Sequence, residues 1–106
     1  MIRFKRGTKI SGIRAELILA LLVAEGVYDK YDTDLVVTSV NDGRHSYTSL
    51  HYSGSAADIR TRELPEADSI QAVAEEIRQD LSDEYDVIVE SDHIHIEYQP
   101  KRGGAR

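Results

Sequence analysis

All four histidines of the chain lie in two short stretches, residues 42–61 and 90–97. Imidazole nitrogens and carboxylate oxygens are ligands that a first-row metal such as zinc accepts. His51, Asp58 and His95 could supply three ligands and leave a fourth position for water, which is the arrangement of a catalytic zinc site. Zinc bound in this way lowers the pKa of water and polarises a carbonyl oxygen. These residue types therefore favour a hydrolase, with an amide as the favoured bond.

The spacing within the two stretches supports this interpretation. Side chains alternate between the two faces of a strand, so His93 and His95 would share one face while the isoleucines beside them take the other. Asp58 follows His51 by seven residues, and Gly54 between them allows the backbone to turn so that a loop ligand and a strand ligand can meet. Ordinary surface or core histidines are the alternative.

Hydrolysis also requires a group that takes a proton from water and passes it to the leaving amine. Asp92 and Glu90 are the candidates, and both lie close to His95 in the sequence. Regular alternation would place Asp92 on the face opposite His95, but a bulge at the expected hairpin turn could re-aim it. Both carboxylates therefore stay open as candidates at this point.

Further polar residues could contact the substrate. His93 and His45 could donate hydrogen bonds to the oxyanion of a tetrahedral intermediate or to a carboxylate of the substrate. Arg44 and Arg60 could bind such a carboxylate through their guanidinium groups. The alternative for both arginines is a solvated surface charge.

Hydrophobic periodicity predicts the elements that would position these residues. Apolar residues recur at helical spacing in two segments, whereas short β-branched or alternating runs predict strands. Only a few residues separate the last two strands, which predicts a hairpin. The sequence thus predicts an α+β domain with a small, mostly antiparallel sheet and helices packed on one face. The expected helices span residues 11–26 and 65–82, and the expected strands span residues 34–40, 56–61, 85–90 and 92–98.

Length and composition predict one domain and exclude several function classes. The chain has 106 residues, of which 41% are hydrophobic, so we expect a single domain over residues 1–106. Its core is expected over about residues 11–98, with a basic, flexible tail over 99–106. The absence of cysteine excludes disulfides, cysteine-ligated metals and a thiol nucleophile. The net charge of -6 argues against nucleic acid as a partner.

The N-terminal sequence is typical neither of a signal peptide nor of a membrane span. The apolar run over residues 17–23 is short, and Arg14 and Glu16 interrupt its approach, so a core helix is favoured. No stretch approaches the about 20 apolar residues that a membrane span requires. We therefore expect synthesis in the cytoplasm and no membrane partner.

Two segments of the sequence resemble a known family. The string S-L-H-Y-S-G-S-A-A-D at residues 49–58 resembles the signature S-x-H-x-x-G-x-A-x-D of the zinc D-alanyl-D-alanine carboxypeptidases and their relatives. These relatives include VanX-type dipeptidases, phage L-alanyl-D-glutamate endolysins and the amino-terminal signalling domain of hedgehog proteins. Residues 92–97 resemble the closing segment of the family, and the resemblance extends over about residues 11–98.

The resemblance implies a hedgehog/DD-peptidase-like fold with one zinc ion per chain. By position in the motifs, His51, Asp58 and His95 match the zinc ligands. His45 and His93 match additional active-site histidines of the hedgehog-like branch. Zinc is the default metal, although such ligands also accept cobalt, nickel or manganese.

The resemblance is less specific for the catalytic acid and for substrate binding. In the peptidase branches the acid stands three residues before the last zinc histidine, which selects Asp92. The hedgehog-like branch would select Glu90, with a deletion of one residue. We favour Asp92 on this basis and keep Glu90 as the second candidate. The family also carries an arginine well upstream of the first zinc ligand, where this chain offers only Arg44, and we assign Arg44 and Ser49 to substrate binding.

The function implied by the resemblance is zinc-dependent hydrolysis of amide bonds in the stem peptides of peptidoglycan. The reaction would be of the D-Ala-D-Ala carboxypeptidase or the L-Ala-D-Glu endopeptidase type, with a carboxylate as general base. A phage or bacterial origin, with release to the cell wall, fits this class. The first alternative is a catalytically inactive zinc-binding module of the same fold that acts as an interaction domain. A metal-free domain in which the histidines only pack is the second alternative.

Overall fold

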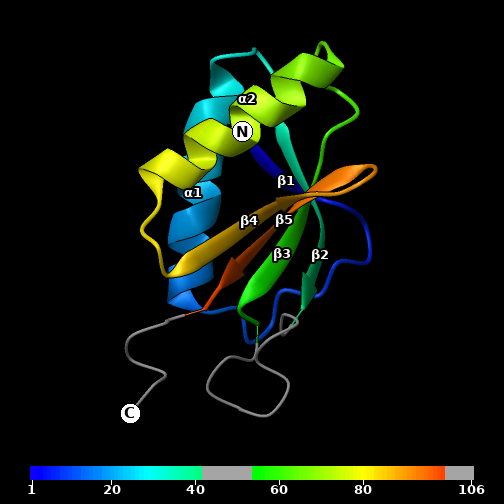
Figure 1. Ribbon diagram of the computed structural model, residues 1–106. Coiled ribbons are helices and arrows are strands. Elements are labelled where there is room, and N and C mark those ends of the chain that lie inside the picture. Colours follow the sequence, from blue (N-terminus) through cyan, green and yellow to red (C-terminus); the bar gives the residue numbers. More distant parts are fainter. Residues whose placement is uncertain (42–53, 100–106) are drawn as a thin grey trace.

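The computed structural model describes residues 1–41 and 54–99, which form two helices and five strands (Figure 1). All six elements predicted from periodicity are present, and a short strand precedes them. The elements are β1 (Ile2–Phe4), α1 (Ala15–Asp29), β2 (Leu35–Asn41), β3 (Ala56–Arg60), α2 (Ala67–Asp80), β4 (Tyr85–Val89) and β5 (His93–Tyr98).

The five strands form one mixed sheet in the order β1-β2-β3-β5-β4. Strands β1 and β2 are parallel, and the other three neighbouring pairs are antiparallel. The β4–β5 pair is the predicted hairpin. Both helices pack on the same face of the sheet, and Figure 1 shows them as one layer beside it. The predicted α+β class, with a mostly antiparallel sheet and helices on one face, is confirmed.

Strand β1 was not predicted. It has only three residues, the middle one of which is Arg3, and Lys5 and Arg6 follow it, so periodicity gives no signal for it. Parallel pairing with β2 forms it, with Ile2 opposite Leu35 and Phe4 opposite Val37. Ile2 also packs against the hydrophobic core, so the folded part of the chain begins before residue 11.

The hydrophobic core lies between the sheet and the helices. On β3 and β5, apolar residues alternate with polar ones, so Ala57, Ile59, Ile94 and Ile96 face the helices. Their polar neighbours consequently leave the sheet on the opposite face. The helices cover the apolar face with buried side chains of their own, namely Leu17, Ala20, Leu21, Ala24, Val27 and Tyr28 of α1 and Val73, Ala74 and Ile77 of α2.

Helix α1 extends three residues beyond the expected end at residue 26 and finishes at Asp29. Its last turn is held by burial, because Val27 and Tyr28 are almost completely enclosed. The hydroxyl of Tyr28 donates a hydrogen bond to the backbone oxygen of Arg60 over 2.8 Å. Burial raises the pKa of Tyr28, with a smaller contribution from the charge of Glu63, so this hydroxyl keeps its proton. The helix is thereby tied to the end of β3.

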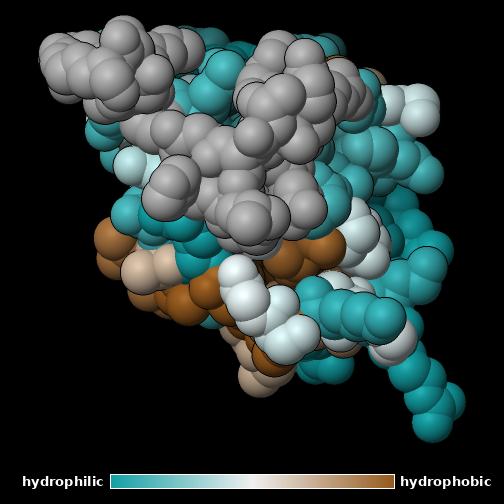
Figure 2. Space-filling view, turned by 90° about the horizontal axis from the view of Figure 1, so that it is seen from below, coloured by the Kyte–Doolittle hydropathy of each residue, from teal (hydrophilic) through white to brown (hydrophobic). Residues whose placement is uncertain are grey.

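The side of α1 that does not pack into the core is also apolar, and it is exposed. Ile18, Leu19 and Leu22 are 43%, 59% and 51% exposed, respectively. Ile18 also lines an apolar groove that Phe4 and Ile10 line as well. Figure 2, which views the molecule from below, shows apolar side chains gathered next to hydrophilic ones. Within residues 1–41 and 54–99, no helix combines the length and the apolar character needed to cross a membrane.

A β-bulge in β2 separates its core-facing part from its polar part. Val37 pairs with Ile59, but the next pair in the ladder is Ser39 with Asp58, so Thr38 is an additional residue on β2. Regular alternation would have kept Ser39 on the same face as Val37. The bulge instead turns Ser39 to the face of Asp58 and returns Val40 to the core.

Candidate functional site

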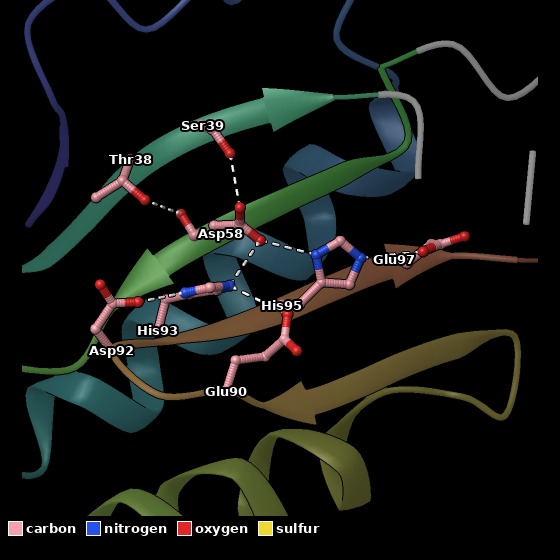
Figure 3. A network of polar contacts seen from close by, with 8 residues as sticks. All are labelled: Thr38, Ser39, Asp58, Glu90, Asp92, His93, His95 and Glu97. Atoms are coloured by element: carbon pink, nitrogen blue, oxygen red, sulfur yellow. Dashed lines mark hydrogen bonds and ion pairs between the residues drawn. The ribbon is translucent and has the colours of Figure 1, made fainter. Parts of the chain in front are cut away.

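Two of the three predicted metal ligands are direct neighbours on the sheet. Asp58 of β3 and His95 of β5 are opposite each other in the antiparallel ladder. Both side chains leave the sheet on the face away from the helices, because their neighbours in each strand belong to the core. Figure 3 shows them at the centre of a network of polar contacts that joins β2, β3, β5 and the β4–β5 turn.

Asp58 is held in place by three contacts from two strands. Its Oδ1 lies 2.8 Å from Nδ1 of His95. The hydroxyl of Ser39 donates to its Oδ2 over 2.8 Å, and the hydroxyl of Thr38 donates to its backbone oxygen over 3.3 Å. The bulge of β2 is therefore a part of the site, because it brings Ser39 to the carboxylate.

His95 is held at both ring nitrogens by carboxylates. Its Nε2 lies 3.0 Å from Oε1 of Glu97, on the side of the ring away from Asp58. The side chains of His95 and Glu97 are only 5% and 1% exposed. A histidine that binds a metal through one nitrogen usually donates its other N–H to a carboxylate or a carbonyl, which fixes the tautomer and the ring orientation. Glu97 occupies that second position.

His93 connects the same network to both candidate acids. Its Nε2 lies 3.5 Å from Oδ1 of Asp58 and 3.3 Å from Oε1 of Glu90. Its Nδ1 lies 2.7 Å from Oδ1 of Asp92. Glu90 and His93 flank the hairpin turn, where the N–H of Glu90 donates to the backbone oxygen of His93 over 2.8 Å.

The two acids differ in their position relative to Asp58. Glu90 contacts the ring nitrogen of His93 that also faces Asp58, and its side chain is 28% exposed. Asp92 contacts the other ring nitrogen and is 84% exposed. The bulge of the sheet lies in β2 and not at the hairpin turn, so it does not turn Asp92 toward His95. Because Glu90 meets the ring nitrogen of His93 that also faces Asp58, the geometry favours Glu90 over Asp92 as the acid of the site.

Contacts within the network raise the pKa values of both imidazoles and lower the pKa of Asp58. The hydrogen bond to Asp58 raises the pKa of His95 against the opposing effect of burial, and Glu97 adds to the increase. For His93, burial lowers the pKa, but the hydrogen bond to Asp92 and the charges of the nearby carboxylates outweigh it, and the net shift is upward. Burial would raise the pKa of Asp58, but its hydrogen bonds with His95 and Ser39 and the nearby His93 lower it overall.

The described side chains fit a zinc site in their chemistry. An imidazole nitrogen of His95 and a carboxylate oxygen of Asp58 face each other, and both are accepted zinc ligands. Glu97 supplies the outer carboxylate contact that such a histidine requires. Among residues 1–41 and 54–99, however, no three His, Cys, Asp or Glu side chains are grouped so that they could hold a metal ion. The predicted third ligand, His51, lies outside the described residues, as do Arg44, His45 and Ser49.

A polar groove borders the network. Its lining includes Ser39, Asp58 and His93 together with three cations, Lys5, Arg60 and Arg62. Arg60, which the sequence suggested as a carboxylate clamp, thus lies beside the candidate site. Its Nη2 is already 2.5 Å from Oε2 of Glu63.

Sequence reasoning missed Ser39 and Glu97. Alternation did place Glu97 on the same face as His93 and His95, and that was the available signal for its role. Ser39 had no such signal, because its orientation depends on the bulge.

No family model matches the chain, and no curated protein matches it either. The functional argument therefore depends on the motifs of the sequence and on the contacts of the described residues.

Proposed function

We propose that this chain is a zinc-dependent peptidase that hydrolyses amide bonds in the stem peptides of peptidoglycan. We further propose that it belongs with the zinc D-alanyl-D-alanine carboxypeptidases and has their hedgehog/DD-peptidase-like fold. The main support is the contact of 2.8 Å between Asp58 and His95, on the sheet face opposite the core. These are two residues that the motifs select as ligands, and they are 37 positions apart in the chain.

In this proposal, His51, Asp58 and His95 hold one zinc ion. When bound, zinc supplies Lewis acidity, which polarises the scissile carbonyl and lowers the pKa of water. Ser39 fixes the carboxylate of Asp58 through its hydroxyl. Glu97 holds the N–H of His95 at Nε2, so that the lone pair of Nδ1 is directed toward Asp58.

The carboxylate of Glu90 is the general base in this proposal. It accepts the proton of the attacking water and delivers it to the nitrogen of the leaving amine, the role that a carboxylate has in amide hydrolysis. Its position beside His93 Nε2, on the Asp58 side of the ring, supports this assignment over Asp92. Asp92 instead orients His93 through Nδ1. His93 then presents Nε2–H as a donor for the developing oxyanion.

The test is digestion of purified peptidoglycan with and without added zinc, and after chelation, with mass spectrometry of the products. Release of terminal D-alanine identifies a carboxypeptidase. Separation of L-alanine from D-glutamate identifies an endopeptidase. Bound zinc without any cleavage would contradict the peptidase proposal and support the inactive zinc-binding module.

The ligand assignment has a separate test in metal content. Asp58→Asn, His95→Ala and His51→Ala should each abolish binding of one zinc ion per chain, measured by metal analysis after dialysis. Glu75→Gln on the exposed surface of α2 is the control and should retain zinc, because within residues 1–41 and 54–99 the hydrogen bonds of Glu75 go to side chains of its own helix. If His51→Ala retained zinc with the affinity of the parent chain, the ligand set would be wrong.

A further inference from the structure

We propose that the groove beside Asp58 and His93 binds a free carboxylate of the peptide substrate, and that the ammonium group of Lys5 is the cation that receives it. This inference rests on the proposed peptidase function. It assigns the residue that would distinguish peptides with a free carboxylate near the scissile bond from their amidated forms. It also assigns a role to the N-terminal strand, which none of the motifs includes.

The backbone of Lys5 is fixed next to the site. Lys5 directly follows β1, and its N–H donates to the backbone oxygen of Val37 over 2.8 Å. The turn that follows is closed by the N–H of Thr8, which donates to the backbone oxygen of Lys5 over 2.9 Å. The hydroxyl of Thr8 also donates to the backbone oxygen of Thr38 over 3.4 Å. These bonds hold Lys5 beside the bulge of β2, where Thr38 and Ser39 donate hydrogen bonds to Asp58.

Strand alternation directs Lys5 to the polar face. Phe4 and Ile2 share one side of β1, and Ile2 packs against the core. The residue after Phe4 therefore leaves the strand on the side away from the core. Lys5 is indeed one of the residues that line the groove with Asp58 and His93.

The charges in the groove leave Lys5 as the available cation. Arg60 and Arg62 both form ion pairs with Glu63, at 2.5 and 3.2 Å. No ion pair within the described part of the chain involves Lys5, although the chain as a whole has a net charge of -6.

The acidic side chains of the groove are also engaged. Asp58 is bound by His95 and Ser39, and Asp92 is bound by His93. A carboxylate that enters the groove thus meets an ammonium donor without displacing an existing ion pair among the described residues.

The experiment uses synthetic stem peptides in which each carboxylate is amidated in turn. For the zinc-loaded chain of residues 1–106, we expect kcat/KM to be roughly tenfold higher for the peptide with one free carboxylate than for its amide, because the amide lacks one charge-assisted contact. Lys5→Gln should reduce this ratio to about one, mainly through KM, and Lys5→Arg should largely restore it. Lys9→Gln is the matched control, since Lys9 is an exposed lysine of the same segment that does not line the groove, and it should keep the ratio of the parent chain.

Failure of this inference can be distinguished from failure of the peptidase proposal. If the ratio of kcat/KM for the carboxylate and amide peptides is the same in the parent chain and in Lys5→Gln, Lys5 in the groove does not bind the carboxylate. The peptidase proposal stands in that case, because both peptides are cleaved. If neither peptide is cleaved, the peptidase proposal fails. Whether the groove binds a carboxylate is then tested by nuclear magnetic resonance titration of the same peptides into the full chain. In that titration, equal dissociation constants for the carboxylate and amide forms would overturn the inference, and a preference that Lys5→Gln abolishes would support it.

Discussion

Replacement of Glu97 by glutamine tests whether this buried carboxylate prepares His95 for metal binding. In the metal-free chain, Glu97 and Asp58 face opposite nitrogens of one imidazole, at 3.0 and 2.8 Å. A neutral imidazole carries one N–H, so the two carboxylates compete for it. Only the tautomer with the proton at Nε2, facing Glu97, leaves Nδ1 free to bind a metal together with Asp58.

The expected loss of zinc affinity in Glu97→Gln follows from the kind of hydrogen bond that the substitution changes. Hydrogen bonds to a charged acceptor contribute about 1.5–3 kcal/mol, and neutral ones about 0.5–1.5 kcal/mol. Glutamine keeps the size of the side chain and can still accept a hydrogen bond, so the expected loss is about 1–1.5 kcal/mol. That loss corresponds to about tenfold weaker zinc binding, at the lower end of what outer-shell substitutions usually cost.

The assay is a competition titration with a chromophoric zinc chelator, with Glu75→Gln as the surface control. A second readout is the ¹⁵N chemical shift of the ring nitrogens of His95, which should move toward the Nδ1–H tautomer in Glu97→Gln. The thermal unfolding of both metal-free variants would show whether the substitution acts through folding alone. Unchanged zinc affinity and an unchanged tautomer in Glu97→Gln would refute the reasoning.

Three further predictions concern the backbone, the acids and pH. Gly54→Ala should lower the free energy of unfolding by at least about 2 kcal/mol in chemical denaturation, because φ is +66° and the new Cβ would lie 2.3 Å from a backbone oxygen. Gly26 is exposed on α1, and a Cβ built on it would have nothing within 4 Å, so Gly26→Ala should instead raise the free energy of unfolding by about 0.5–1 kcal/mol. Equal changes in the free energy of unfolding for the two variants would contradict this account. Glu90→Gln should lower kcat for stem-peptide hydrolysis by about 10²–10⁴-fold, whereas Asp92→Asn should cost less than about tenfold, and the opposite order would restore Asp92 as the base. The raised pKa values of the two β5 histidines stabilise the metal-free fold below about pH 6.5, and this contribution is lost as pH rises through the folded-state pKa values. Zinc must displace the proton of His95, so the increase in Tm on adding zinc should be larger at pH 8 than at pH 6, and a pH-independent increase would argue against this site.

Local patterns in the sequence were sufficient for most of the secondary structure. The apolar stripes of α1 and α2 and the alternation in β5 are signals contained within single segments, and the structure confirms the elements that they predicted. The same alternation correctly separated His95 from the isoleucines of the core. Strand β1 escaped prediction because its three residues are ordered by pairing with β2, which lies about 30 residues further along the chain.

The candidate site was predicted less completely because its details depend on contacts between segments. The pair of Asp58 and His95 was anticipated from the motifs, but the contact of Ser39 with Asp58 requires the register of β2 against β3. The choice between Glu90 and Asp92 likewise depends on which ring nitrogen of His93 each acid meets. The assignments within residues 42–53 stay predictions.

The bulge at Thr38 is a position at which β2 could lose one residue without exchanging its two faces. Before the bulge, odd-numbered residues such as Val37 face the core, and after it an even-numbered residue, Val40, does so. Deletion of Thr38 alone would remove the extra residue and restore regular alternation, which keeps Ser39 opposite Asp58 and Val40 on the core face. The loss would be confined to the hydrogen bond from the hydroxyl of Thr38 to the backbone oxygen of Asp58. Relatives of this chain that use the same site should therefore tolerate a gap of one residue at position 38, whereas insertion of a further residue before Ser39 would turn its hydroxyl away from Asp58.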